Sequence, residues 1–475
     1  MQAINPYNQK ARQRALHLQQ YKHSTHVWVH FLHLTHRLIC MQNSVSALSG
    51  ISEPSASLND EIASTSKLKI CLLGYRSNPY SGGQGIYIRY LSKALVRQGH
   101  QVDVISGEPY PILDSGVNLI KLPGLNLFEA ENHVTALRPR HMLSYTDFFE
   151  WFSMFTGGFP EPYTFGRRLV KYFRRHKPDY DIVHDNQSLC FGLLNLQNMG
   201  IPLVATIHHP ITSDLAIALG NTDDWKLRLL IRRWHSFLGM QKKVVGRLKH
   251  IVTVSEQSRV DIASAFGIDA ATIKVVHNGI DTEIFCPRPG TDRIPFRIMA
   301  TASADQPLKG LSYLIEAIAL LTPAYPQIHL VVLGKINAGG ESQQLITRLG
   351  LQAQIRFVSG VSTDELVTLY AETSLVVVPS IYEGFGLPAG EAMACGVAVV
   401  STDGGALPEV VGDGGILVPV RDPGAIARAV ADLLDHPEKT KALGLKARAR
   451  ILDKFSWQVA AASMTQTYQH IIDNA

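Results

Sequence analysis

Residues 68–106 decide the fold, and they read LKICLLGYRSNPYSGGQGIYIRYLSKALVRQGHQVDVIS. The apolar run Leu68–Gly74 has the length of a buried strand, a glycine-rich turn follows at 81–85, and apolar residues then recur with helical spacing over Ile86–Arg97. A second apolar strand is expected at Gln101–Ser106. This order of strand, helix and strand predicts a βαβ unit, from which parallel sheets are built.

The same alternation continues along the chain in two series. Further strands are expected at Ile182–His184, Leu203–Ile207, Ile251–Val254, Ile273–Val276, Arg297–Thr301, His329–Gly334, Ile355–Val358, Leu375–Pro379 and Ala398–Ser401. The Pro/Gly-containing stretch Pro287–Pro295 separates the two series and suits a linker. We therefore expect an α/β protein with two doubly wound, Rossmann-like domains that face each other, with the ligand site between them at the carboxyl ends of the strands.

The domain boundaries follow from these patterns. An N-terminal domain is expected at 67–285, a C-terminal domain at 286–455, and a final helix at 456–475 that returns to the N-terminal domain. Residues 1–66 are rich in Gln, His and Ser and show no sustained strand pattern. A transit peptide, a true start at Met41 and a poorly ordered extension are the open interpretations of this segment, and the last of them is the simplest.

Composition excludes several classes of protein. A content of 46% hydrophobic and 18% charged residues over 475 residues is ordinary for a globular chain. The acid-free residues 1–52 carry the whole net charge of +5, so the rest of the chain is neutral, which argues against a nucleic-acid-binding protein. The five dispersed cysteines form no zinc-ligand spacing and indicate a reducing, cytoplasmic compartment, and no apolar run is long enough to span a bilayer.

The most informative motif is Glu383-Gly-Phe-Gly-Leu-Pro-Ala-Gly-Glu391, which follows the predicted strand Leu375–Pro379. It places two carboxylates around a glycine-rich turn at the carboxyl end of a strand. The glycines allow backbone N–H groups to approach an oxygen-rich ligand, and a carboxylate in the following helix can accept two hydroxyl hydrogen bonds. The alternative, a turn cap and a solvated helix acid, leaves the glycines unexplained.

This motif resembles the Glu, seven residues, Glu signature of the retaining glycosyltransferases of family 4, which have the GT-B fold. The resemblance extends over about residues 68–457. It includes Gly82-Gly83-Gln84, Thr206-Ile207-His208, Val254-Ser255, His277-Asn278-Gly279-Ile280-Asp281, Lys309-Gly310 and Gly404-Gly405-Ala406-Leu407-Pro408-Glu409.

The resemblance implies roles for individual residues. Glu391 would hold the ribose hydroxyls of a nucleoside diphosphate sugar, Glu383 the transferred sugar, and Lys309 the diphosphate. The expected donor contacts are Gly83, Lys309, Glu383, Gly384, Phe385, Gly386, Leu387 and Glu391, and the expected catalytic residues are His208, Glu383 and Lys309. Because a cation and helix N-termini can stabilise the leaving diphosphate, we expect neither a metal nor a cofactor.

One position departs from the family pattern. An arginine usually stands five residues before the lysine, and this chain has Ala304 there, with Asp305 beside it. The cationic pair around the diphosphate is therefore incomplete, so another basic residue or the backbone must supply part of the neutralisation.

The acceptor side is expected in the N-terminal domain. His208 and His209 end the predicted strand Leu203–Ile207, and the Thr-x-His pattern assigns His208 to the reaction centre, with a purely structural pair as the alternative. We place Gln84, His209, Arg232 and Arg233 on the acceptor side. The last two belong to a basic amphipathic stretch, 226–249, with eight basic residues and no acid, which suits anionic lipid, a phosphate-bearing acceptor or the domain core.

These patterns together favour a retaining, metal-independent hexosyltransferase that moves a sugar from a UDP- or GDP-sugar to a hydroxyl acceptor, with lipid or phosphorylated acceptors included. The expected location is the cytoplasm, with peripheral contact to the inner membrane face as an open addition. Two alternatives remain: a nucleotide-sugar epimerase of the same fold, and a non-catalytic sugar-nucleotide or membrane-binding protein. The sequence contains no GxGxxG, GxxxxGK[ST] or GxSxG motif, which disfavours dinucleotide, P-loop and serine-hydrolase chemistry.

Overall fold

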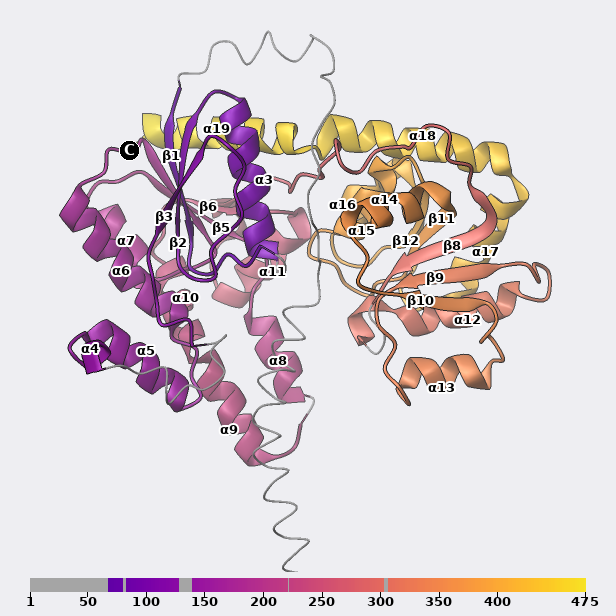
Figure 1. The fold of residues 1–475 in the computed structure, drawn as a ribbon, viewed down its shortest axis with the longest axis horizontal. Helices are drawn as coiled ribbons and strands as arrows, with labels where there is room; N and C mark the ends of the chain where they lie inside the picture. Colours follow the sequence, from indigo (N-terminus) through magenta and orange to yellow (C-terminus); the bar gives the residue numbers. More distant parts are fainter. Residues whose placement is uncertain (1–66, 80–82, 128–138, 221, 303–305) are drawn as a thin grey trace, which may run out of the picture.

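A computed structural model describes residues 67–79, 83–127, 139–220, 222–302 and 306–475. The predicted tail, 1–66, and the departure at Ala304 both lie outside these residues. The described chain forms two parallel sheets, each covered by helices on both faces, which stand side by side (Figure 1).

The N-terminal sheet has the strand order β3-β2-β1-β4-β5-β6-β7, with every pair parallel. Its strands are β1 (Lys69–Gly74), β2 (Gln101–Ser106), β3 (Val117–Lys121), β4 (Ile182–Asn186), β5 (Leu203–Ile207), β6 (Ile251–Thr253) and β7 (Ile273–Val275). Its helices are α3 (Gly83–Arg97), α4 (Pro139–Met142), α5 (Tyr145–Phe155), α6 (Glu161–His176), α7 (Phe191–Asn198), α8 (Thr212–Gly220), α9 (Trp225–Trp234), η1 (His235–Phe237), α10 (Leu238–Val245), α11 (Glu256–Phe266) and η2 (Ala270–Thr272).

The C-terminal sheet has the order β10-β9-β8-β11-β12-β13, again with every pair parallel. Its strands are β8 (Ile294–Thr301), β9 (His329–Leu333), β10 (Ile355–Val358), β11 (Thr373–Val378), β12 (Ala398–Thr402) and β13 (Ile416–Val418). The remaining helices are η3 (Pro307–Lys309), α12 (Leu311–Leu321), α13 (Glu341–Arg348), α14 (Thr363–Glu372), α15 (Leu387–Ala394), α16 (Leu407–Val411), η4 (Gly412–Gly414), α17 (Pro423–Asp435), α18 (Pro437–Lys454) and α19 (Trp457–Asp473).

Burial on both faces explains why the strands read as continuous apolar runs. In β1, Ile70 and Leu72 pack with α3 and α19, whereas Cys71 and Leu73 pack with α6, α7 and α10. Successive side chains of a strand point to opposite faces, so a strand between two helix layers needs an apolar residue at every position. Both sheets have the strand order of a doubly wound fold, and the predicted fold class is confirmed.

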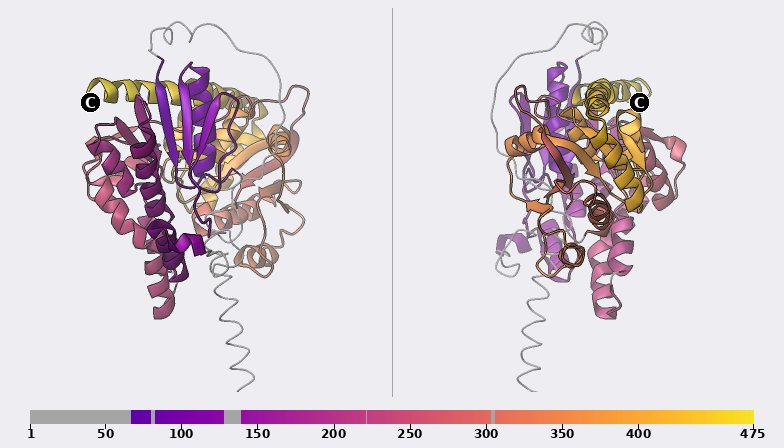
Figure 2. Two further views of the ribbon diagram at one scale, coloured as in Figure 1. Left: turned by 60° about the vertical axis from the view of Figure 1, so that its left-hand side comes forward. Right: turned by 90° about the vertical axis from the view of Figure 1, so that its right-hand side faces the viewer.

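The chain crosses between the two sheets twice, at the segment after β7 and at the junction of α18 and α19. The two crossings touch, because the Ile280 N–H donates to the Phe455 carbonyl at 2.6 Å and a Cβ on Gly279 would lie 2.5 Å from Trp457 Cα. Helix α19 then packs against α3, with the Trp457 ring stacked on Tyr90 at 5.7 Å. Figures 1 and 2 show α18 and α19 running along one side of both domains.

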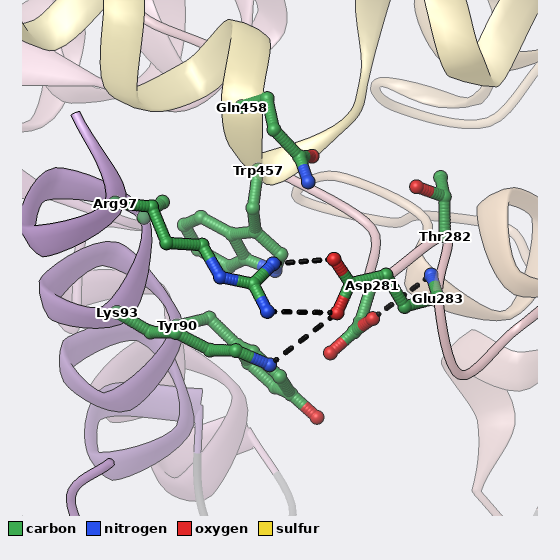
Figure 3. Close-up of a pocket in the computed structure, with 9 residues that line it drawn as sticks. Tyr90, Lys93, Arg97, Asp281, Thr282, Glu283, Trp457 and Gln458 are labelled. Atoms are coloured by element: carbon green, nitrogen blue, oxygen red, sulfur yellow. Dashed lines mark hydrogen bonds and ion pairs between the residues drawn. The ribbon is translucent and has the colours of Figure 1, made fainter. Parts of the chain in front are cut away.

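A small hollow of about 270 Å³ marks this hinge, between α3, the crossing segment and α19 (Figure 3). Here Glu283 of the crossing segment lies 3.1 Å from an Arg97 guanidinium nitrogen and 3.6 Å from Lys93 Nζ, both on α3. Because these ion pairs are partly exposed to solvent, they add little stability and mainly hold the crossing segment beside α3.

One sequence expectation, a single basic helix over 226–249, needs correction. The basic stretch 226–249 is not one helix, because α9 ends at Trp234 and the 3₁₀ turn η1 separates it from α10. Trp234 and Phe237 both pack on Phe159, and the turn brings the two rings to the same partner. In the part of the chain that the structure describes, no helix is long and apolar enough to cross a membrane.

Candidate active site

The carboxyl ends of the two sheets meet across the gap between the domains, and the Glu383 motif lies at that junction. Two hydroxyls of the N-terminal domain donate to the Gly384 carbonyl, from Ser255 at 2.9 Å and Ser258 at 3.1 Å. The loop is also tied to α11 by the Tyr382 hydroxyl, which donates to Asp261 at 2.5 Å. The motif therefore belongs to the C-terminal domain but rests directly on the N-terminal one.

Glycines shape the loop that carries Glu383. Gly386 has φ of 102°, and a Cβ there would lie 2.8 Å from Leu407 Cδ2. At Gly405, with φ of 65°, a Cβ would lie 2.3 Å from the Glu383 carbonyl oxygen. Both positions need the left-handed backbone and the missing side chain of glycine. The predicted turn before α15 is thereby held against the Gly404-Gly405 loop.

Lys309 and Glu383 form an ion pair, with Nζ 2.7 Å from Oε1 and side chains 23% and 12% exposed. The Ser380 hydroxyl donates to the same oxygen at 2.8 Å. Lys309 is brought there by Gly310, whose φ is 63° and whose Cβ would lie 2.0 Å from the Pro379 carbonyl oxygen. An ammonium has three N–H donors, so the pair leaves Lys309 able to contact a further anion.

Glu391 lies on α15, the helix that follows the Glu383 loop. The Tyr370 hydroxyl of α14 donates to Glu391 Oε2 at 3.3 Å. Burial raises the pKa of Glu391 to about 7, although the Tyr370 hydrogen bond opposes the shift. Burial also raises the pKa of Tyr90 on α3, and the nearby charges of Asp281 and Glu391 raise it further. Glu391 therefore lies within electrostatic reach of the N-terminal domain and can exchange a proton near neutral pH.

On the N-terminal side, the two predicted histidines are not equivalent. His208 is half-buried, with its ring edge-on to Tyr87 at 4.7 Å, whereas His209 is exposed and lies 3.4 Å from Asp214. Gln187 holds the backbone between them, accepting from the His208 N–H at 2.7 Å and donating to the His209 carbonyl at 2.8 Å. The structure therefore separates a fixed ring, His208, from a solvated one.

Asn186 fixes the His208 ring. Its amide nitrogen donates to the Gln84 carbonyl at 2.9 Å, so its oxygen is the atom that faces His208 Nε2 at 2.6 Å. An amide oxygen accepts only, and we therefore assign the proton of the neutral ring to Nε2 and a lone pair to Nδ1. Burial lowers the pKa of His208 to about 3, with smaller contributions from His209 and His184, so the ring stays neutral at physiological pH.

A line of buried polar groups continues behind this ring. The Tyr87 hydroxyl lies 3.4 Å from Thr206 Oγ1, which lies 2.7 Å from His184 Nε2. His184 Nδ1 lies 2.6 Å from the hydroxyl of Tyr468 on α19. The C-terminal helix is thus joined through hydrogen bonds to the tyrosine that packs on His208.

Gly83 and Gln84, the first residues of α3, lie beside these groups. A Cβ on Gly83 would meet nothing within 4 Å, whereas the Gln84 carbonyl is held by Asn186. An adjoining open hollow of about 290 Å³ is lined by Tyr75, Gly107, Glu108, Leu122, Gly124, Asn126, Glu150, Glu161, Thr164, Phe165 and Arg168. It follows the ends of β1, β2 and β3, and its Arg168 and Glu150 side chains are paired with each other.

The structure does not bring Arg232 and Arg233 into this constellation. Both lie on α9, which Figure 1 shows extending beyond the lower end of the N-terminal domain. Arg233 donates to Thr156 at 2.9 Å and to the Ser153 hydroxyl at 3.1 Å, both on the C-terminal end of α5. Arg232 is exposed to solvent. Their contact with an acceptor therefore stays a prediction.

Sequence reasoning missed Asn186, Gln187 and Tyr87. The first two follow Asp185, the residue after His184, at the carboxyl end of a predicted strand, and this position alone could have marked them as site residues. Tyr87 lies in the first turns of the same helix as Gly83 and Gln84, where its spacing resembles that of a core residue.

Comparison with known proteins identifies the family of the chain. Residues 81–284 match Glycosyltransferase Family 4, and residues 295–450 match Glycosyl transferases group 1. The MMP alpha-(1->4)-mannosyltransferase of Mycolicibacterium hassiacum is 41% identical over 409 residues, which are 85% of this chain and 98% of that protein. The D-inositol 3-phosphate glycosyltransferase 2 of Catenulispora acidiphila is 28% identical over 437 residues, 86% of this chain and 96% of that protein.

Among solved structures, HepE of Anabaena in complex with UDP has the same fold, with a TM-score of 0.61 at 18% identity over 85% of this chain and 100% of that chain. The recognition made from the Glu383 motif is confirmed, and the chain belongs to the family 4, group 1 glycosyltransferases.

Proposed function

We propose that the chain is a retaining hexosyltransferase, with mannose as the first sugar to test, that uses a nucleoside diphosphate sugar and a hydroxyl acceptor. The observation that carries the proposal is the Lys309–Glu383 ion pair, held by glycine turns at the strand ends that face His208. The 41% identical relative bears the name of a mannosyltransferase, and HepE was solved with UDP. The proposal includes a UDP- or GDP-sugar as the donor and a hydroxyl group as the acceptor.

The proposed step breaks the bond between the anomeric carbon and the phosphate oxygen and forms a bond to the acceptor oxygen on the same face of the sugar. The acceptor proton passes to the leaving phosphate, so no protein nucleophile is consumed. Lys309 and the N-terminus of α15 stabilise the diphosphate as its negative charge develops, and no metal is needed for this neutralisation.

The other residues position the substrates. Glu391 accepts hydrogen bonds from the ribose hydroxyls, and Glu383 accepts from the sugar. The neutral His208 offers its Nδ1 lone pair to a sugar hydroxyl, so it orients the sugar and is not a proton donor. The acceptor lies over Gln84 and the hollow lined by Tyr75 and Glu161.

The relatives are transferases by name, which favours transfer over epimerisation of the donor. A cytoplasmic location belongs to the proposal as well. In its support, the four cysteines in the described residues are all free, and three of them are buried.

The proposal is tested first by thermal shift with GDP-mannose, UDP-glucose and ADP-glucose. A ligand present at about 100 times its Kd adds about 2.7 kcal/mol of stability. The stabilising donor is then incubated with mannoside and inositol phosphate acceptors, and proton NMR follows the anomeric signal. We expect an α-linked product from an α-linked donor. An inverted linkage would overturn retention, an epimerised free donor would establish the epimerase, and binding without any product would support the non-catalytic alternative.

A further inference from the structure

We propose that the N-terminal domain docks on an anionic lipid surface through the exposed aromatic face of α4 and α5. The proposal refines the membrane contact expected from the basic stretch 226–249 and moves it to other helices. It adds a location to the proposed transferase, and its binding test does not depend on catalytic activity.

The aromatic face consists of six large apolar side chains, each at least 39% exposed: Met142, Leu143, Tyr145, Phe148, Phe152 and Phe155. The four from α5 are spaced three, four and three residues apart, so they share one side of the helix. Leu143, just before α5, is 91% exposed. Exposed apolar patches of this kind mark interaction surfaces in soluble domains.

The opposite side of α5 is firmly attached to the domain. Met154 packs with Leu127 and Trp234, and the buried Glu150 accepts from the Leu125 N–H at 2.9 Å. Arg233 fastens the C-terminal end of the helix through Ser153 and Thr156. The exposed side is therefore presented by a fixed helix and does not result from fraying.

A basic stripe on α6 adjoins the aromatic face. Arg167, Lys171 and Arg174 are exposed and are spaced four and three residues apart, on one side of the helix. The Arg167 guanidinium lies over the Tyr145 ring at 4.8 Å, and its Nε donates to Thr146 Oγ1 at 3.1 Å. The two surfaces are therefore continuous.

Each acid of this region is paired with an arginine. Residues 139–176 contain three acids, Asp147, Glu150 and Glu161. Arg168 contacts Asp147 and Glu150, each at 2.5 Å, and Arg76 contacts Glu161 at 3.2 Å. Each carboxylate is thereby matched by an internal arginine, which leaves the exposed surface basic and apolar.

This chemistry favours an anionic bilayer over a second copy of the chain. Aromatic and aliphatic side chains enter the headgroup region while the flanking lysine and arginine side chains meet anionic headgroups. In a two-fold contact through the same face, the basic stripe of one copy would approach that of the other, with no exposed acid of α4–α6 to meet it. Figure 1 places α4 and α5 on the side of the N-terminal domain away from the C-terminal one, so docking leaves the gap between the domains accessible.

The test is sedimentation of the full chain with vesicles of phosphatidylcholine alone and of phosphatidylcholine mixed with phosphatidylglycerol, at low salt. Two double variants probe the surface: Leu143→Ser with Phe152→Ser, and Arg167→Glu with Lys171→Glu. Matched controls carry the same changes on α18, which belongs to the C-terminal domain. They are Leu445→Ser with Leu452→Ser, at side chains 67% and 45% exposed, and Lys441→Glu with Lys454→Glu, at exposed lysines.

We expect binding to the mixed vesicles only, a fall in the partition constant of about tenfold or more in each α4–α6 variant, and unchanged binding in the controls. Thermal melting and donor-induced thermal shift confirm that each variant is folded. Absence of wild-type binding to the mixed vesicles would overturn the proposal, as would equal losses in the controls. Loss of a dimer in the Leu143/Phe152 variant, seen by light scattering, would assign the face to a second copy instead. An intact transferase without vesicle binding would leave the proposed function untouched.

Discussion

The two sides of the inter-domain site differ in how they handle charge. On the C-terminal side, Lys309, Glu383 and Glu391 are ionisable groups held by glycine turns at close backbone approaches. On the N-terminal side, His208 is kept neutral and is oriented by the amides of Asn186 and Gln187. The comparison suggests a division of labour, in which one side stabilises developing charge and the other orients uncharged hydroxyls.

Removing Lys309 or Glu383 should have the largest effect, because both act where charge develops in the proposed reaction. We expect Lys309→Met to lower kcat/KM by about 10²–10³ and to weaken binding of the bare nucleoside diphosphate. Glu383→Gln should lower kcat by about 10² as well, since the sugar loses a charged acceptor. It should not weaken the bare diphosphate, because Lys309 loses its competing partner.

Calorimetry with the bare diphosphate and steady-state rates measure these effects. Lys441→Met, at an exposed lysine of α18, controls for loss of a positive charge. Equal losses of diphosphate affinity in the Lys309 and Glu383 variants would contradict the separate roles and would indicate that the pair is only a structural unit.

Glu391 should give an intermediate effect that depends on pH. Its pKa is raised from the ordinary value of 4.5 to about 7 in the folded chain, so the protonated form is the one that folding favours. The contribution to stability is therefore full below about pH 4.5 and is lost as pH rises toward 7. Nucleotide affinity should move the other way, because the ionised carboxylate accepts both ribose hydroxyls.

Glu391→Gln should remove both pH dependences and weaken the nucleotide by about 1.5–3 kcal/mol at pH 8, where the wild-type carboxylate is ionised. Urea unfolding and nucleotide titrations at several pH values measure the two trends. Glu438→Gln, at an exposed residue of α18, should change neither. A wild-type nucleotide affinity that does not vary between pH 5.5 and 8 would exclude the proposed contact.

Most of the secondary structure could be predicted from the sequence. The strands predicted from apolar runs are present, and Gln101–Ser106, Leu203–Ile207 and Ile355–Val358 have the predicted bounds. Strands β3 and β13 were missed because they are edge strands with partly exposed residues, which weakens the apolar run. The break at η1 was missed because it depends on tertiary packing of Trp234 and Phe237 on Phe159.

In the site, the C-terminal residues were predictable because glycines and acids occur within one short motif. The N-terminal residues come from three separate segments, and only the folded sheet brings Gln84, Asn186 and His208 together. The Lys309–Glu383 contact was not predicted either, because the two residues are 74 positions apart and the ion pair depends on Gly310 meeting Pro379. The sequence motifs therefore predicted the charged residues of the site but not the hydrogen bonds that hold its neutral residues together.

Asn186→Asp should have the smallest effect, and it tests whether neutrality of His208 matters. A carboxylate at this position would face Nε2, and an opposite charge at hydrogen-bond distance raises a histidine pKa. The wild-type ring has a pKa of about 3 and does not titrate between pH 5 and 8, whereas the ring of the variant should gain a proton as pH falls. Protonation removes the Nδ1 lone pair, so the variant should lose activity on the acid side.

The measurement is the ratio of kcat/KM in Asn186→Asp to that of the wild type across this pH range, because a ratio cancels titration of Glu391, which both proteins share. We expect a ratio of about one half at pH 8 that falls to about one tenth at pH 5.5, because the nearby carboxylate favours the protonated ring as pH falls. Asn198→Asp makes the same chemical change at an exposed position on α7 and should keep a ratio near one throughout. A ratio for Asn186→Asp that is low but independent of pH would show that Asn186 acts only through its hydrogen bond to Gln84. Neutrality of the ring would then be incidental, and the contrast between the two sides of the site would reduce to a difference in packing.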